Sequence, residues 1–231
     1  MNEKLTEKLN QARLLKKHFK LPETVAVLKE CLAIDPNCLI AAAQAGLCLL
    51  LQGKAREAES FFQKAFDGSG KTDLPVGAYL AVCMTAADKD DEAENLLETI
   101  RGRQPDFSAA ETYMLAAEML AEKKQYEQAV RLIDALSVRF AGDAFFTAPV
   151  NHYRMIRVLA LAGLIDIAGQ LADALKQKMP GNWEALAAEA SVAIAMEKYE
   201  DAYSLTVRAL QSGGASYPLL AAQQHWLAMN K

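Results

Sequence analysis

A segment of 13 residues that recurs six times constrains the fold of this chain more than any other feature of its sequence. The copies begin at Thr24, Ala58, Ala93, Ala129, Ala168 and Ala202, so their starts lie 34, 35, 36, 39 and 34 residues apart. In each copy the first position is small, and the positions four and seven residues later are mostly apolar. These three positions share one face of an α-helix. The segment therefore predicts one helix per repeat.

A second small position precedes each copy by 12 residues. It is occupied by Ala12, Gly46, Ala81, Ala117, Ile156 and Ala190, of which only Ile156 is large. The position three residues after it is apolar, and this spacing predicts another helix. The small residue would let the backbone of this helix approach its neighbour closely. Pro or Gly stands at the end of five of the six copies and terminates the second helix. Each repeat is therefore predicted to be helix A, a turn, helix B and a second turn.

Composition excludes most other classes of protein. Apolar residues make up 52% of the 231 residues, Gly and Pro number only 12 and 7, and no alternating run of β-branched residues predicts a strand. The net charge is −4, and the one basic stretch, at 16–20, fits a solvated helix end, so we expect no nucleic-acid partner. Cysteines without metal-site spacing, a charged N-terminal segment and short apolar runs predict a cytoplasmic protein that does not insert into membranes.

These spacings resemble the tetratricopeptide repeat (TPR) family. The second repeat matches best, at Ala45, Gly46, Leu49, Gly53, Ala58, Phe62 and Ala65. Tyr126 and Tyr199 stand at the family's aromatic position before helix B, whereas its helix-A tryptophan is absent. The resemblance implies an all-α fold, a right-handed α-α superhelical solenoid of about six TPR-like helix-turn-helix repeats plus a C-terminal capping helix.

We expect a single TPR-like solenoid over residues 1–231. The predicted repeats are 5–38, 39–73, 74–109, 110–148, 149–182 and 183–216, and the capping helix is 217–230. Ser216 is an expected N-cap, and Pro218 suits the first turn. A solenoid needs such a cap because its end repeat has no neighbour to cover its apolar face. Trp226 and Leu227 are expected to supply the covering contacts.

The A helices line the concave surface in this family, so the resemblance implies a groove for a protein or peptide partner. The expected contacts are Leu9, Arg13, Ile40, Gln44, Leu47, Tyr79, Val82, Met114, Glu118, Tyr153, Arg154 and Arg157. The apolar members suit an amphipathic helix or an extended segment, and Arg154 and Arg157 suit an acidic group. The sequence leaves open whether the apolar members line the groove or pack in the core, since a shift of one residue exchanges the two.

Family members that hold the acidic tails of heat-shock chaperones carry Lys and Asn at the matching groove positions. Here those positions hold Leu9, Arg13, Gln44, Pro75 and Tyr79, so we do not expect that ligand. The longest repeat contains Phe145 and Phe146 in an inserted loop. The two rings either fold back over the core or form a second contact site.

We predict no catalytic, cofactor or metal site. Residues 65–72 fit a relaxed phosphate-loop pattern but follow a predicted helix, and His18, His152 and His225 lack metal-ligand spacing. The acidic run 88–94 fits the solvated start of a helix. The leading hypothesis is thus a scaffold or adaptor and not an enzyme. The alternatives are a chaperone for secreted or membrane-inserting proteins and a self-assembling structural protein, which would form a homo-oligomer.

Overall fold

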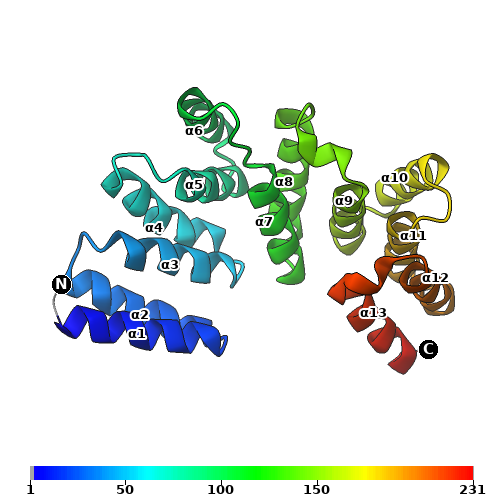
Figure 1. Ribbon diagram of the computed structural model, residues 1–231, viewed down its shortest axis with the longest axis horizontal. Helices are drawn as coiled ribbons and strands as arrows, with labels where there is room; N and C mark the ends of the chain where they lie inside the picture. The colour runs from blue at the N-terminus through cyan, green and yellow to red at the C-terminus, as the bar shows by residue number, and fades with distance from the viewer. Residues whose placement is uncertain (1–2, 231) are drawn as a thin grey trace. The chain divides into compact units, whose positions relative to one another are not determined.

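A computed structural model describes residues 3–230 of the chain (Figure 1). Those residues form thirteen α-helices, two short 3-10 helices and no strand. The α-helices are α1 Glu3–Lys17, α2 Leu21–Ile34, α3 Leu39–Leu50, α4 Ala55–Gly68, α5 Leu74–Ala86, α6 Asp90–Arg103, α7 Ala110–Glu122, α8 Tyr126–Arg139, α9 Pro149–Leu161, α10 Ile165–Lys178, α11 Trp183–Ala195, α12 Tyr199–Gln211 and α13 Pro218–Met229. The 3-10 helices are η1 Ala144–Thr147 and η2 Gly214–Ser216. Six A–B pairs and a last helix confirm the predicted all-α repeat fold.

The chain forms two compact units, Met1–Leu136 and Ser137–Lys231. In the first unit each helix packs on the next from α1 through α6, and α7 packs on α5 and also reaches α3. In the second unit α9 contacts α10 and α11, α11 contacts α10 and α12, and α13 contacts α12. Contacts between sequence neighbours thus build each unit, as in other repeat proteins.

Both recurrent small positions lie in the core. The six residues that open the repeated segment are at most 1% exposed, including Thr24, whose hydroxyl donates to the Lys20 carbonyl over 2.7 Å. The second small position is buried in all six pairs, even where Ile156 replaces a small residue. At Gly46 an added Cβ would lie 3.0 Å from the Phe62 ring. The glycine therefore lets a large aromatic ring of α4 rest against the backbone of α3.

The turn between helix A and helix B has the same backbone conformation in every pair. One residue, always five positions before the repeated segment, takes a positive φ: Phe19, Gly53, Asp88, Lys124, Gly163 and Glu197, at 55° to 79°. The next N–H then donates to the carbonyl five residues earlier over 2.8–3.0 Å, as from Lys54 to Leu49. This pairing satisfies carbonyls at the end of helix A and reverses the chain toward helix B. Residue type alone does not reveal this turn, because only two of the six positions are glycine.

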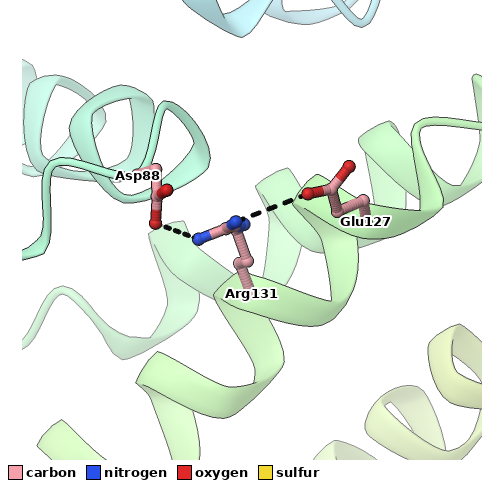
Figure 2. A network of polar contacts seen from close by, with 3 residues as sticks. All are labelled: Asp88, Glu127 and Arg131. Carbon is pink, nitrogen blue, oxygen red and sulfur yellow. Dashed lines mark hydrogen bonds and ion pairs between the residues drawn. The ribbon is translucent and has the colours of Figure 1, made fainter.

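Side chains at these turns also join distant helices of the first unit. Figure 2 shows Asp88, from the turn between α5 and α6, with its carboxylate paired to Arg131 of α8. The other guanidinium nitrogen of Arg131 lies 3.4 Å from Glu127. The hydrogen bonds to Asp88 and Glu127 raise the pKa of Arg131. Asp88, the first residue of the acidic run, is thus an ion-pair partner, and Asp90, Asp91 and Glu92 occupy the first turn of α6.

The capping helix differs in detail from its prediction. Pro218 opens α13 as expected, but the N-cap residue of this helix is Tyr217 and not Ser216. Leu220 and Leu227 are fully buried and cover the end of the second unit. Trp226 remains 42% exposed and meets the Tyr199 ring edge-on at 5.7 Å between centroids. Leu227 therefore makes the covering contact, whereas Trp226 lies mainly outside it.

We predict that Gly53→Ala destabilises the first unit. Gly53 has a φ of 77°, and an added Cβ would lie 2.8 Å from the Cβ of Lys123. The left-handed conformation alone costs a non-glycine residue about 1–2 kcal/mol. Denaturant unfolding should show this loss, whereas the control Gly102→Ala in α6, which would meet no atom within 4 Å, should leave stability unchanged or slightly higher. Equal stabilities of the two variants would contradict the left-handed backbone conformation of Gly53.

The opposite change is expected at Glu197, which holds the same turn position with a φ of 60° and is exposed. Glu197→Gly should raise the free energy of unfolding by up to about 1 kcal/mol, because glycine takes this conformation without steric cost. The neighbouring Met196 has a φ of −87°, so Met196→Gly serves as the control and should destabilise. The same direction of change in both variants would argue against a strained turn.

Candidate partner-binding groove

Four of the predicted groove residues lie around one cavity in the first unit. The cavity has a volume of about 380 Å³ and lies between α1, α2 and α3. Its lining residues are Leu9, Asn10, Ala12, Arg13, Lys16, Thr24, Leu28, Ile40 and Gln44. Leu9, Arg13, Ile40 and Gln44 were expected from their places on helix A, whereas Thr24 and Leu28 come from helix B.

Helical spacing brings these side chains together. On α1, Leu9, Arg13 and Lys16 follow one another at intervals of four and three residues and share a face. Ile40 and Gln44 are four residues apart on α3. Because α1 and α3 both pack against α2, the buried Leu28 of α2 forms the floor between them. The cavity is therefore built by three consecutive helices of the repeat pattern.

The cavity combines an apolar floor with a cationic rim. Ile40 is 69% exposed, which is unusual for so large an apolar side chain. Lys16 donates from Nζ to Oε1 of Gln44 over 2.5 Å and so links α1 to α3, while Arg13 is exposed. None of the nine lining residues is acidic. A ligand with an apolar group beside a negative charge would complement this surface.

Leu47 and Tyr79 lie outside this cavity and are both half-buried. The Tyr79 ring stacks on Phe62 with centroids 5.4 Å apart and planes at 11°. Burial raises the pKa of the Tyr79 hydroxyl. This tyrosine therefore extends the aromatic packing between α4 and α5 and keeps part of its surface accessible.

Val82 and Met114 are fully buried, and the structure places them in the core of the first unit. The reason is that α7 packs on α5 and carries Tyr113, whose hydroxyl lies 2.9 Å from that of Thr85. Neither side chain has surface left for a partner, so we leave both out of the groove. Glu118, one turn further along α7, is half-buried.

In the second unit the residues predicted to contact a partner are also largely buried by the rest of the unit. Tyr153 is fully buried, with its ring edge-on to Trp183 at 6.0 Å and to Tyr217 at 5.7 Å. Arg154 is 8% exposed and donates to Asn151 over 3.1 Å, while Arg157 is half-buried. Tyr153 and Arg154 therefore hold α9 in place and do not present themselves to a partner.

The loop with the adjacent aromatics folds back onto α9. Phe145 is 9% exposed, and Phe146 is half-buried and packs edge-on to it with centroids 5.3 Å apart. Asn151 donates to the Phe145 carbonyl over 2.9 Å, and Nε2 of His152 lies 3.0 Å from the Phe146 carbonyl. Of the two alternatives for this loop, the structure favours packing over the core.

Residues 3–230 contain no cluster of His, Cys, Asp and Glu side chains that could hold a metal ion. Helix α4 runs to Gly68, so a helix and not a strand precedes the phosphate-loop-like segment. Within the same residues, no helix combines the length and the apolar character needed to cross a membrane.

Comparison with known proteins supports the repeat assignment. The family model for the second ARM domain of tetratricopeptide repeat protein 21 matches residues 13–143, more than half of the chain. No curated protein sequence is significantly similar to the chain. A tetratricopeptide repeat protein from Parabacteroides merdae is similar in structure, with a TM-score of 0.53, 11% identity and coverage of 97% of this chain and 84% of that one.

Two further solved structures are similar at lower scores. The TPR domain of P58(IPK) has a TM-score of 0.43 and 13% identity, and the match covers 98% of this chain and 65% of that one. YrrB, described as a TPR protein with an unusual peptide-binding site, has a TM-score of 0.36 and 16% identity, and the match covers 94% and 90%. Of these three structures, the protein from Parabacteroides merdae is the one with a TM-score above 0.5, and at 11% identity it indicates the fold and no ligand.

The four cysteines should differ sharply in reactivity. Cys31, Cys48 and Cys83 are buried thiols whose burial raises their pKa, whereas Cys38 is half-buried. Only the thiolate reacts readily, so an aromatic disulfide reagent at mildly alkaline pH should modify one thiol per chain rapidly. The other three should react only as the chain unfolds. Cys38→Ser should abolish the rapid phase, and two or more rapid thiols in the native chain would contradict the packing.

Proposed function

The chain belongs to the family of the second ARM domain of tetratricopeptide repeat protein 21, and on this premise we propose that it binds a segment of another protein. TPR-like repeat proteins are in general non-enzymatic scaffolds for protein–protein interaction. Their shared architecture supplies surfaces and leaves the ligand to the exposed side chains. The proposal therefore depends on which helix-A side chains are accessible.

The observation that carries the proposal is the cavity between α1, α2 and α3. Its volume of about 380 Å³ accommodates one or two large side chains and not a whole helix. A bound segment, helical or extended, would place an apolar side chain over Leu28 and beside Ile40. A carboxylate next to that side chain would then lie near Arg13 and Lys16, whose charges no acidic lining residue opposes.

This binding mode would make the chain an adaptor or scaffold, with no reacting group required of it. The chaperone alternative has one observation in its favour, the exposure of Ile40 above an apolar floor. A chaperone for secreted or membrane-inserting proteins would accept many apolar segments without selecting an acidic residue. The sequences of bound peptides therefore discriminate between the two functions.

The test is a selection of peptides from a random displayed library on the purified chain. We expect the selected peptides to share a large apolar residue with Asp or Glu one to four positions away. Fluorescence anisotropy should show binding at least about tenfold weaker for Ile40→Glu, because a buried carboxylate would replace an apolar contact, and also for Arg13→Glu. Val138→Glu is the matched control, since Val138 is 79% exposed and lies on α8.

Selected peptides without an acidic preference that still lose affinity for Ile40→Glu would favour the chaperone alternative. Peptides that bind Ile40→Glu, Arg13→Glu and the unchanged chain equally would place the binding site elsewhere. A selection that yields no binding peptide would overturn the proposed function. Circular dichroism of each variant should match that of the unchanged chain, because both substituted side chains are exposed.

A further inference from the structure

Helix α13 has the composition of a buried helix but is mostly exposed. Its sequence, PLLAAQQHWLAM, contains no Asp, Glu, Lys or Arg, like the sequences of α3 and α5. However, α3 buries seven of its 12 residues and α5 nine of 13, whereas α13 buries only Leu220 and Leu227. A helix that caps a solenoid in solution is expected to present a polar outer face. The outer face of α13 does not fit that role.

The large exposed apolar side chains of α13 form one stripe. Leu219 is 42% exposed, Trp226 42% and Met229 66%, and the exposed Ala222 lies between them. Their spacing of three, four and three residues keeps them on one face of the helix, as in the seam of a coiled coil. Leu220 and Leu227 face α12 and its neighbours instead. The stripe is therefore a second apolar face, separate from the one that covers the second unit.

The stripe is symmetric about Gln224. Leu219 and Met229 lie five residues on either side of Gln224, and Ala222 and Trp226 lie two residues on either side. Two copies of the helix packed antiparallel would therefore set Leu219 opposite Met229 and Ala222 opposite Trp226. The small side chain leaves room for the indole of the second copy, and both copies use the same surface, as a twofold interface requires.

We propose that the chain forms a homodimer in which two α13 helices pack antiparallel through this stripe. An interface between identical surfaces brings like charges together, and α13 carries no charged residue that would oppose this. A charged surface of another protein would find no charge to pair with on the stripe. The second copy is therefore the occupant that the surface fits best.

The contact is small. A 12-residue helix is about 18 Å long, so the pair buries less than the roughly 1,200–2,000 Å² of a stable complex. The dimer should be weak and concentration-dependent, with a dissociation constant on the order of micromolar or above. This inference does not rest on the proposed function, because the cavity lies in the first unit and α13 in the second.

Sedimentation velocity over about 1–300 µM should test the association. The weight-average mass of the unchanged chain should rise toward twice that of the monomer. Met229→Glu should remain a monomer over the same range, because a carboxylate on the stripe would be desolvated in the dimer. The control Val138→Glu should associate like the unchanged chain. A monomeric unchanged chain, or equal association of Met229→Glu, would overturn the proposal.

Cysteine cross-linking tests the orientation. Leu219→Cys and Met229→Cys, each combined with Cys38→Ser, would be mixed and oxidised with glutathione disulfide. The antiparallel pair should give a covalent dimer at least about fivefold more abundant in the mixture than in either variant alone, because only the mixture sets the new thiols opposite each other. Equal or stronger cross-linking within Leu219→Cys alone would indicate parallel helices and overturn the arrangement.

Discussion

The left-handed turn between helix A and helix B is the constraint on which the rest of the structure depends. At six positions one residue with a positive φ reverses the chain, and the following N–H closes a hydrogen bond to helix A. The turn sets the rotation of helix B against helix A, so that Ala58 and Gly46 can both lie in the core. Four of the six turns hold a residue other than glycine at this position. The packing of the helices must compensate the steric cost of a positive φ at these four residues.

The sequence predicted the helices well and their turns poorly, for a physical reason. Helical spacing is visible wherever small and apolar residues recur, and even the exceptional Ile156 is buried at its predicted position. A left-handed turn is visible only where it has selected glycine, as at Gly53. At Phe19 and Lys124 the same conformation leaves no trace in the residue type, because tertiary packing and not local preference imposes it.

The candidate groove was predicted only in part, because residue spacing gives a position on a helix but not the distance to the next one. Leu9 and Ile40 line a cavity because α1 and α3 meet across α2. Val82, which corresponds to Arg13 and Leu47 in the repeat, is buried, since α7 packs directly on α5. Tyr153 is covered by Tyr217, which is 64 residues away in the sequence. No local pattern encodes such a contact.

The two surfaces proposed for recognition differ in their physics. The cavity joins an apolar floor to Arg13 and Lys16, so part of its binding energy would be Coulombic and would decrease as salt screens the rim. The stripe of α13 carries no charge, and its association would depend on burial of Trp226, Leu219 and Met229, which salting-out anions strengthen. Salt would therefore weaken peptide binding at the cavity and strengthen self-association through the stripe. Because the two effects are opposite, either association can be measured in the presence of the other.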